Sequence, residues 1–119
     1  MKSDGEDSIV SYLFRNQIGN LAIAPLKSFN KHLALDHNIY PDVEKCWGYG
    51  LIINKEPIPK KREAGSGSWA GVLNTYFWID PKSDVAGVFL AQILPCYSPN
   101  LLNAFLSFED LVYERLIRN

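Results

Sequence analysis

The stretch at residues 65–80, GSGSWAGVLNTYFWID, most constrains what this chain can fold into. It opens with four small residues and passes through the triplet WAG at 69–71 into β-type residues at 75–79, TYFWI. A glycine beside a tryptophan lets another group approach the backbone closely, next to a flat aromatic surface. Asp80 and Pro81 then supply a turn signal. The pattern predicts a strand that offers its backbone to a ligand.

Two further stretches predict strands. Residues 85–94, VAGVFLAQIL, follow after a four-residue turn at 81–84, which indicates an antiparallel hairpin with the first strand. This stretch is apolar on both faces, as is typical of a strand at the centre of its sheet or covered by helices on both sides. Upstream, residues 46–54 read as a strand that contains two glycines, which suggest a bend or close packing. We therefore expect an antiparallel sheet of about three strands.

The chain is predicted to end in an amphipathic helix. Ser98 is a suitable N-cap, and Pro99 suits the first helical position. The following apolar residues recur at helical spacing over about five turns, and polar residues such as Glu109 lie mainly off that stripe. We expect the stripe to pack on the hairpin in an α+β fold. Ser8 predicts the cap of a second, short helix that ends near Gly19.

The remaining segments have no regular pattern. Residues 20–45 are irregular, and so long a segment is unusual in a small domain, which suggests that it contacts something outside this chain. Residues 1–7 are expected to be disordered. The polar stretch 55–63 is expected to be a solvated loop, with a phosphate-binding patch as the alternative. We treat residues 1–119 as a single domain.

Composition argues against several classes of protein. Apolar residues make up 47% of the chain, which allows a packed core, and the formal charge of −1 gives no basic excess for nucleic acid. Cys46 and Cys96 lack the spacing of a zinc site, so we expect buried free thiols. The N-terminus shows no apolar leader, and the apolar run at 85–95 is too short to cross a bilayer. We expect a cytoplasmic protein without cofactor or metal.

Several motifs in order resemble a known family. They are WGYGL at 47–51, GSWAG at 67–71, YFWIDP at 76–81 and VAGVFL at 85–90, followed by the closing helix. Their order resembles the C-terminal part of the serine β-lactamase-related hydrolases. That superfamily includes class C β-lactamases, penicillin-binding proteins and a branch of esterases and transesterases. Its third active-site motif is Lys-Thr-Gly, His-Thr-Gly or a triplet such as Trp-Gly-Gly, and a tryptophan there resembles the esterase and transesterase branch.

The resemblance implies roles for four residues. Trp69, Ala70 and Gly71 stand at the position of the triplet, so Trp69 would line the pocket for the acyl or leaving group. Ala70 lacks the hydroxyl of the family threonine. The backbone N–H of Val72, the next residue, would donate to the oxyanion hole, where such donors lower a barrier by a few kcal/mol. From the residues alone, Trp69 can equally be a strand aromatic that covers the core, with Gly71 at a bulge.

Other parts of the family's machinery are missing. The chemistry needs a nucleophilic serine with a lysine three residues later on a helix, and a Tyr-x-Asn or Ser-x-Asn element. Ser28 and Lys31 have the first spacing but lie in an irregular stretch, and no tyrosine begins a Tyr-x-Asn. His32 and His37 are a conceivable metal pair, although packed or solvated loop histidines fit them better.

The sequence therefore predicts a C-terminal fragment of a hydrolase that is inactive alone. It would act on a small acyl or ester substrate if the missing part of the domain were supplied. Two alternatives remain open. One is a non-catalytic binding module that uses the groove at residues 69–72, and the other is a homo-oligomer that covers its exposed sheet with a second copy.

Overall fold

The computed structural model describes residues 8–118 of the chain, so the predicted disorder of residues 1–7 lies outside the described part. The elements, in chain order, are α1 (Ile9–Leu13), β1 (Lys45–Trp47), β2 (Ile52–Asn54), β3 (Gly67–Gly71), β4 (Thr75–Asp80), β5 (Val85–Phe89) and α2 (Pro99–Arg118). The predicted α+β fold, an antiparallel sheet with a C-terminal helix and a short N-terminal helix, is confirmed.

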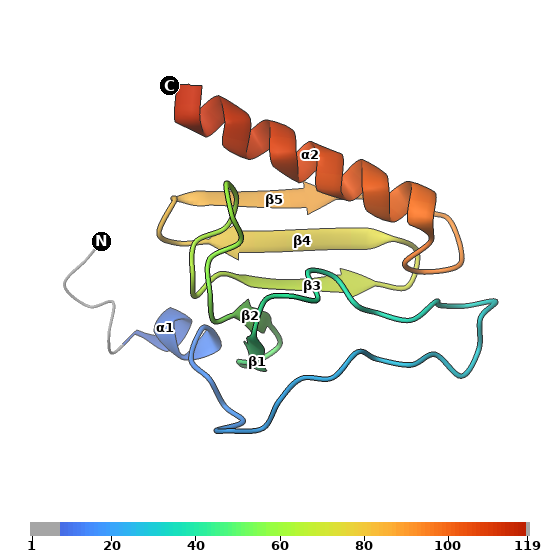
Figure 1. The fold of residues 1–119 in the computed structure, drawn as a ribbon, viewed down its shortest axis with the longest axis horizontal. Helices are drawn as coiled ribbons and strands as arrows, with labels where there is room; N and C mark the ends of the chain where they lie inside the picture. Colours follow the sequence, from blue (N-terminus) through green and yellow to red (C-terminus); the bar gives the residue numbers. More distant parts are fainter. Residues whose placement is uncertain (1–7, 119) are drawn as a thin grey trace.

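The sheet contains five strands, not about three, in the order β1-β2-β3-β4-β5 (Figure 1). Each strand is antiparallel to its neighbour. The difference arises because two of the predicted strands are hairpins. Residues 46–54 divide between β1 and β2, and residues 65–80 divide between β3 and β4.

Backbone conformation explains both divisions. Gly50, between β1 and β2, has φ 77°, which a glycine adopts without steric cost. Asn74, between β3 and β4, has φ 64°, and asparagine is one of the few other residues that tolerate this region. The Asn74 side chain also donates to the carbonyl oxygens of Ile93 and Pro95, at 2.6 and 2.7 Å. These bonds tie the turn to the chain that follows β5.

The first helix begins where the sequence predicts and ends earlier. The Ser11 backbone N–H donates to the Ser8 side-chain oxygen at 3.2 Å, which is the expected N-cap bond. The helix stops at Leu13 rather than near Gly19. Its end is packed against the β1–β2 turn, where a Cβ on Gly48 would lie 2.0 Å from the Leu13 carbonyl oxygen.

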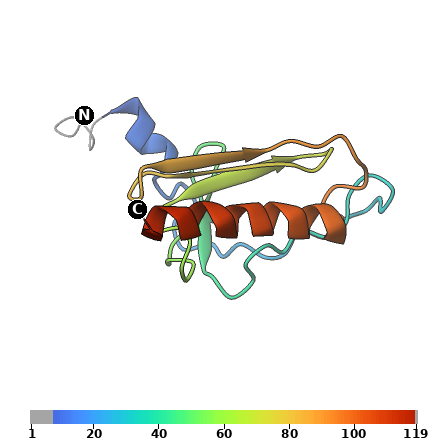
Figure 2. The ribbon, with the colours of Figure 1, turned by 90° about the horizontal axis from the view of Figure 1, so that it is seen from above.

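The last strand differs from its prediction in length and in position. The predicted turn at 81–84 is confirmed, but β5 ends at Phe89 rather than at residue 94. Among the described residues β5 is an edge strand, so the prediction of a central strand, or one covered on both faces, is wrong. Helix α2 lies along one face of the sheet (Figure 2). On the other face, Val88 remains 61% exposed.

The core lies between that face and α2. Tyr76, Trp78, Phe105 and Tyr113 form the buried hydrophobic cluster. Tyr76 and Phe105 stack at 4.8 Å between ring centroids, and Trp78 Nε1 donates to the Tyr113 hydroxyl at 3.0 Å. That hydroxyl donates in turn to Asp80 at 2.8 Å. The predicted apolar stripe of the helix therefore packs on the β4–β5 hairpin, as expected.

The start of α2 is also where the sequence places it. The helix begins at Pro99, directly after Ser98. The Ser98 hydroxyl is buried but has no hydrogen-bond partner among the described residues, so it does not act as a side-chain cap. Its backbone carbonyl accepts from Leu102 at 2.9 Å and begins the helical pattern.

The segment at residues 20–45 has no helix, and strand β1 begins only at Lys45. One isolated bridge, between Ala34 and Cys96, attaches it to the chain after β5, and a second, between Leu26 and His37, joins two parts of the segment itself. Figure 1 shows the segment running out along one side of the sheet and returning to β1. The part that returns to β1 includes His37, Ile39 and Tyr40, which line the candidate site.

Candidate functional site

Strand β3 has neighbours on both sides over only part of its length. Strand β2 pairs with it at Gly67 and Ser68, whereas the pairing with β4 continues through Gly71. Trp69, Ala70 and Gly71 therefore have β4 on one side and no strand on the other. The predicted triplet lies at the end of β3, where only β4 pairs with it.

Trp69 lies on the face of the sheet opposite α2. It pairs with Phe77 across the ladder, and cross-strand partners share a face. The Trp69 ring is half-buried and meets Trp47 edge-on, at 4.6 Å and 70°. His37 lies 5.5 Å from the same ring and 4.8 Å from the ring of Tyr97. Trp69 therefore belongs to an aromatic wall at the sheet edge, outside the buried cluster.

Ala70 and Gly71 lie differently from Trp69. Ala70 pairs with Tyr76, so its side chain is on the α2 side and packs against the buried cluster. The Gly71 carbonyl accepts from Cys96 Sγ at 3.2 Å. Both Cys46 and Cys96 are buried and free, as predicted, and burial raises the pKa of each thiol. Neither thiol is therefore activated as a nucleophile.

Val72 opens the turn after β3. The β3–β4 register ends at the pair of Gly71 and Thr75, so Val72 has no partner across the ladder. Val72 is 54% exposed. The oxyanion role of its backbone N–H stays a prediction, and the geometry leaves this residue outside the sheet at the end of the triplet.

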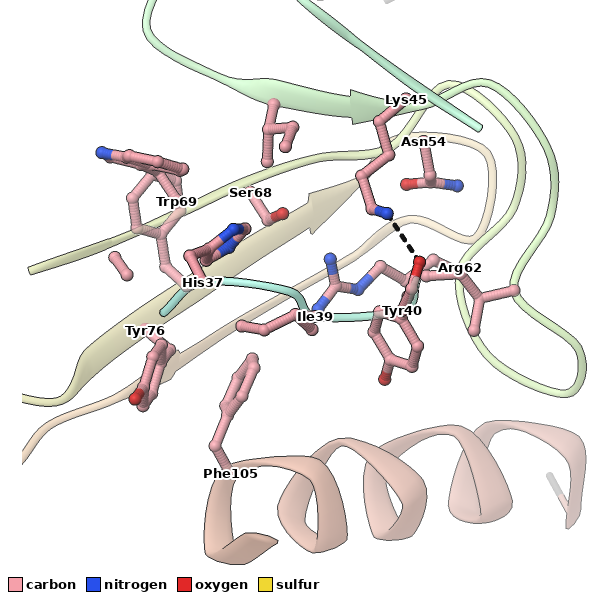
Figure 3. Close-up of a pocket in the computed structure, with 14 residues that line it drawn as sticks. His37, Ile39, Tyr40, Lys45, Asn54, Arg62, Ser68, Trp69, Tyr76 and Phe105 are labelled. Carbon is pink, nitrogen blue, oxygen red and sulfur yellow. Dashed lines mark hydrogen bonds between the residues drawn. The ribbon is translucent and has the colours of Figure 1, made fainter. Parts of the chain in front are cut away.

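A narrow cavity of about 30 Å³ lies beside the triplet (Figure 3). Its walls include Ser68, Trp69 and Ala70 of β3, and it is closed by the returning part of the irregular segment and by α2. Asn54 also lines it, and the Asn54 Oδ1 atom is buried without a hydrogen-bond partner in the described structure. The space is large enough for about two water molecules, and Asn54 Oδ1 is a suitable acceptor for one of them.

A buried polar network fixes the segment that closes this cavity. Arg62 donates to both carboxylate oxygens of Glu109, at 2.5 and 3.1 Å, and both side chains are buried. The Tyr40 hydroxyl donates to the same carboxylate at 2.7 Å. Burial and the Glu109 charge raise the pKa of Tyr40 above its ordinary range. Most of the loop at 55–63 is exposed, as predicted, but Arg62 is buried. The prediction that Glu109 lies off the packed stripe is wrong, and its burial is possible because the Arg62 charge neutralises it.

Two further basic side chains, Lys45 and His37, line the cavity. Lys45 Nζ donates to the carbonyl oxygens of Tyr40 and Val43, at 2.6 and 3.0 Å, and burial lowers the pKa of this lysine. His37 is buried, and burial together with the Lys45 charge lowers its pKa. His37 is therefore neutral at pH 7. His32 is exposed. Residues 8–118 contain no group of three or more His, Cys, Asp or Glu side chains that could hold a metal ion.

The Ser28 and Lys31 pair does not have the geometry of a nucleophile and its base. Residues 28–31 form no helix. Lys31 forms an ion pair with Asp36, and the Ser28 backbone N–H donates to the same carboxylate at 2.8 Å. The bonds from Lys31 and Ser28 hold the pKa of Asp36 well below its usual range. The ammonium group is therefore committed to Asp36 instead of to Ser28.

Sequence reasoning missed the two neighbours of Trp69. Trp47 was read as a strand residue at the start of the WGYGL motif, and His37 only as half of a conceivable metal pair. Both contacts depend on tertiary structure, since one comes from β1 and the other from the irregular segment. No spacing in the sequence signals them.

The antiparallel sheet and the closing helix are similar to those of a serine β-lactamase-like protein, consistent with its C-terminal part. The chain is similar to solved structures of simvastatin synthase LovD from Aspergillus terreus, a serine β-lactamase-like acyltransferase. The LovD6 mutant is 25% identical with a TM-score of 0.63, over 65% of this chain and 20% of that chain. The unliganded selenomethionyl form is 27% identical with a TM-score of 0.60, over 61% and 19%.

These matches confirm the resemblance predicted from the sequence. The matched part of this chain spans about a fifth of the length of the LovD chains. No protein-family model matches the chain, and no curated protein does. Within residues 8–118, neither helix has the length and apolar content needed to cross a membrane.

Proposed function

We propose that this chain supplies one wall of an active site for acyl transfer or ester hydrolysis. In this proposal Trp69 lines the pocket for the acyl or leaving group, and the Val72 backbone N–H donates to the oxyanion. Gly71 lets the substrate approach the end of β3, and Ala70 braces the strand against the core. The Trp-Ala-Gly triplet favours an esterase or transesterase over a β-lactamase.

One observation supports the proposal more than any other. The triplet occupies the part of β3 that has no strand on its outer side, and Val72 follows it in an exposed turn. An oxyanion hole needs a backbone donor that is not used by the sheet and that is held by a rigid element. The bonds from Asn74 to Ile93 and Pro95 provide that rigidity.

We also propose that the chain by itself does not turn over substrate. Ser28 has no base, because Lys31 is paired with Asp36. Both cysteine thiols are buried. The nucleophile and the general base would come from a part of the domain outside these residues.

A chimera tests the oxyanion role. The matching C-terminal segment of the Aspergillus terreus simvastatin synthase is replaced by this chain, and acyl transfer is measured for the chimera with and without Val72→Pro. Proline removes the backbone N–H, so we expect kcat to fall about 100-fold to 1,000-fold. Val72→Ala keeps the N–H and should stay near the unsubstituted chimera. Equal activity of the two variants, with equal thermal stability, would overturn the proposed role.

The chain alone provides a second test. With a p-nitrophenyl ester we expect only the background rate, and Ser28→Ala should leave it unchanged. Clear turnover that Ser28→Ala abolishes would show an independent active site and contradict the proposal.

A second candidate function is a binding or oligomerising module without catalysis. The observation that favours it is the uncovered edge strand β5, with Val88 exposed on the face away from α2. An apolar edge of this kind favours association with another strand. Light scattering after size-exclusion chromatography distinguishes a dimer from a monomer.

A further inference from the structure

Lys45 of β1 and Asn54 of β2 are partners across the ladder, and both line the narrow cavity beside the triplet (Figure 3). Cross-strand partners share a face of the sheet, with roughly 5 Å between their Cβ atoms. The hydrogen bonds that each of the two side chains donates go to backbone carbonyl groups elsewhere. A small third group can therefore contact both side chains at once.

Asn54 contributes a hydrogen-bond acceptor to this cavity. Its Nδ2 donates to the carbonyl oxygens of Glu56 and Glu63, at 2.8 and 2.9 Å, so both amide hydrogens are used and the orientation of the amide is fixed. Asn54 is 4% exposed, and its Oδ1 has no hydrogen-bond partner among residues 8–118. An unpaired buried acceptor is costly, so a molecule that binds here should bring a donor.

Lys45 contributes a positive charge. Two of the three donors of its ammonium group go to the carbonyl oxygens of Tyr40 and Val43. These oxygens are neutral and do not cancel the charge. Within the part of the chain that the structure describes, Lys45 forms no ion pair with a carboxylate. The remaining donor and the charge both favour an anion.

The other titratable side chains of the narrow cavity leave this charge uncancelled. Arg62 uses Nε and Nη2 for Glu109, so that pair is neutral and Nη1 is left for another acceptor. The lowered pKa of His37 and the raised pKa of Tyr40 keep both side chains uncharged at pH 7. The walls therefore carry one net positive charge, which suits an ion with a single negative charge.

The dimensions of the cavity limit the size of that ion. A space of about 30 Å³, enough for about two water molecules, suits a planar ion of about four heavy atoms. A larger cavity of about 280 Å³ adjoins it and shares four wall residues, His37, Ile39, Lys45 and Ile52. This larger space gives a small ion a path to Lys45. Asp42 and Glu44 line only the larger cavity, and Glu44 is paired with Lys55 at 2.9 Å.

We infer that the narrow cavity binds a small monovalent oxyanion that carries one hydroxyl group, of the size and shape of bicarbonate. Its negative oxygen atoms accept from Lys45 Nζ and Arg62 Nη1, and its hydroxyl donates to Asn54 Oδ1. The bound ion neutralises the Lys45 charge and so stabilises the part of the irregular segment that Lys45 holds through Tyr40 and Val43. The inference does not depend on the proposed oxyanion role of Val72.

Nuclear magnetic resonance of the full chain tests the inference. The labelled protein is titrated with sodium bicarbonate at pH 8, while sodium chloride keeps the ionic strength constant. We expect saturable shifts of the Asn54 side-chain amide and of the His37 ring. Nitrate has the same planar shape and charge but no hydroxyl, so it leaves Asn54 Oδ1 unpaired and should bind at least about tenfold more weakly. Equal binding of the two ions, or no saturable shift with bicarbonate, would overturn the inference.

Two lysine substitutions make the test specific. Lys45→Met removes the ammonium group but keeps the length of the side chain, and should weaken bicarbonate binding about tenfold or more. Lys55→Met removes an ammonium group that lines neither cavity and should leave binding unchanged. Unchanged affinity in Lys45→Met, in a protein that circular dichroism shows to be folded, contradicts the inference. If Lys45→Met does not fold, the comparison of bicarbonate with nitrate in the unsubstituted chain decides.

Discussion

Arg62 Nε lies 2.5 Å from Glu109 Oε2, and both side chains are buried. This pair joins the loop after β2 to the middle of α2. The Tyr40 hydroxyl bonds to the same carboxylate, so the irregular segment is attached at the same point. Because the charges are desolvated, losing one partner costs far more than the net contribution of the intact pair.

The first prediction concerns this ion pair. Glu109→Gln keeps the shape of the side chain but leaves the Arg62 charge buried and unpaired. We expect the free energy of unfolding to fall by about 3–5 kcal/mol, measured by urea denaturation. The neighbouring Asp110 is exposed and pairs with Lys61 at 2.9 Å. Asp110→Asn should cost less than about 1 kcal/mol, and equal losses in the two variants would contradict the prediction.

The second prediction concerns pH. The folded state lowers the pKa of His37 from 6.5, through burial and the Lys45 charge, so protonation favours the unfolded chain. The stability linked to His37 is therefore present above about pH 6.5 and is lost as the pH falls from there through the folded pKa. The Asp80 pKa is also lowered, because bonds from Glu63, Tyr113 and Ser83 outweigh its burial, but its effect begins below about pH 4.

Thermal unfolding at pH 7.5 and pH 5.5 measures the His37 effect. We expect the wild-type midpoint to fall over this range, and His37→Gln to reduce that fall. His32 is exposed, so His32→Gln should behave like the wild type. The prediction fails if His32→Gln changes the pH dependence as much as His37→Gln does.

The third prediction concerns the contact between β4 and β5. A Cβ on Gly87 would lie 2.0 to 2.7 Å from ring carbons of Trp78, which is buried in the core. Gly87→Ala forces the ring to move and should destabilise the fold by about 1–3 kcal/mol or more. Ala86→Val, on the exposed face next to it, should change the unfolding midpoint little. If the near-ultraviolet circular dichroism of Gly87→Ala is unchanged, the Trp78 ring is not displaced and the prediction is wrong.

The fourth prediction concerns self-association through β5. If the uncovered edge pairs with a second copy, light scattering should give about twice the monomer mass at micromolar concentration. Val88→Lys places a charge on that edge strand and should shift the protein toward monomer. Leu111→Lys changes an exposed apolar residue on α2 and should not. A wild-type protein that is monomeric throughout would reject this association.

Much of the fold was predictable because it depends on local signals. The turn at 81–84, the start of α2 at Pro99 and its apolar stripe all follow from turn residues and helical periodicity. The turns that divide 46–54 and 65–80 were not recognised. Gly50 and Asn74 take positive φ values there, but continuous β-type residues on either side conceal the reversal.

By itself the sequence determined the class of fold, the order of the motifs and the position of Trp69, Ala70, Gly71 and Val72 relative to one another. Those properties depend on residues that are neighbours in the sequence. Only the tertiary structure decided that β2 does not pair with β3 beside the triplet, that His37 packs on Trp69 and that Arg62 reaches Glu109. The physical reason is that burial, desolvation and charge pairing depend on which distant segments come together.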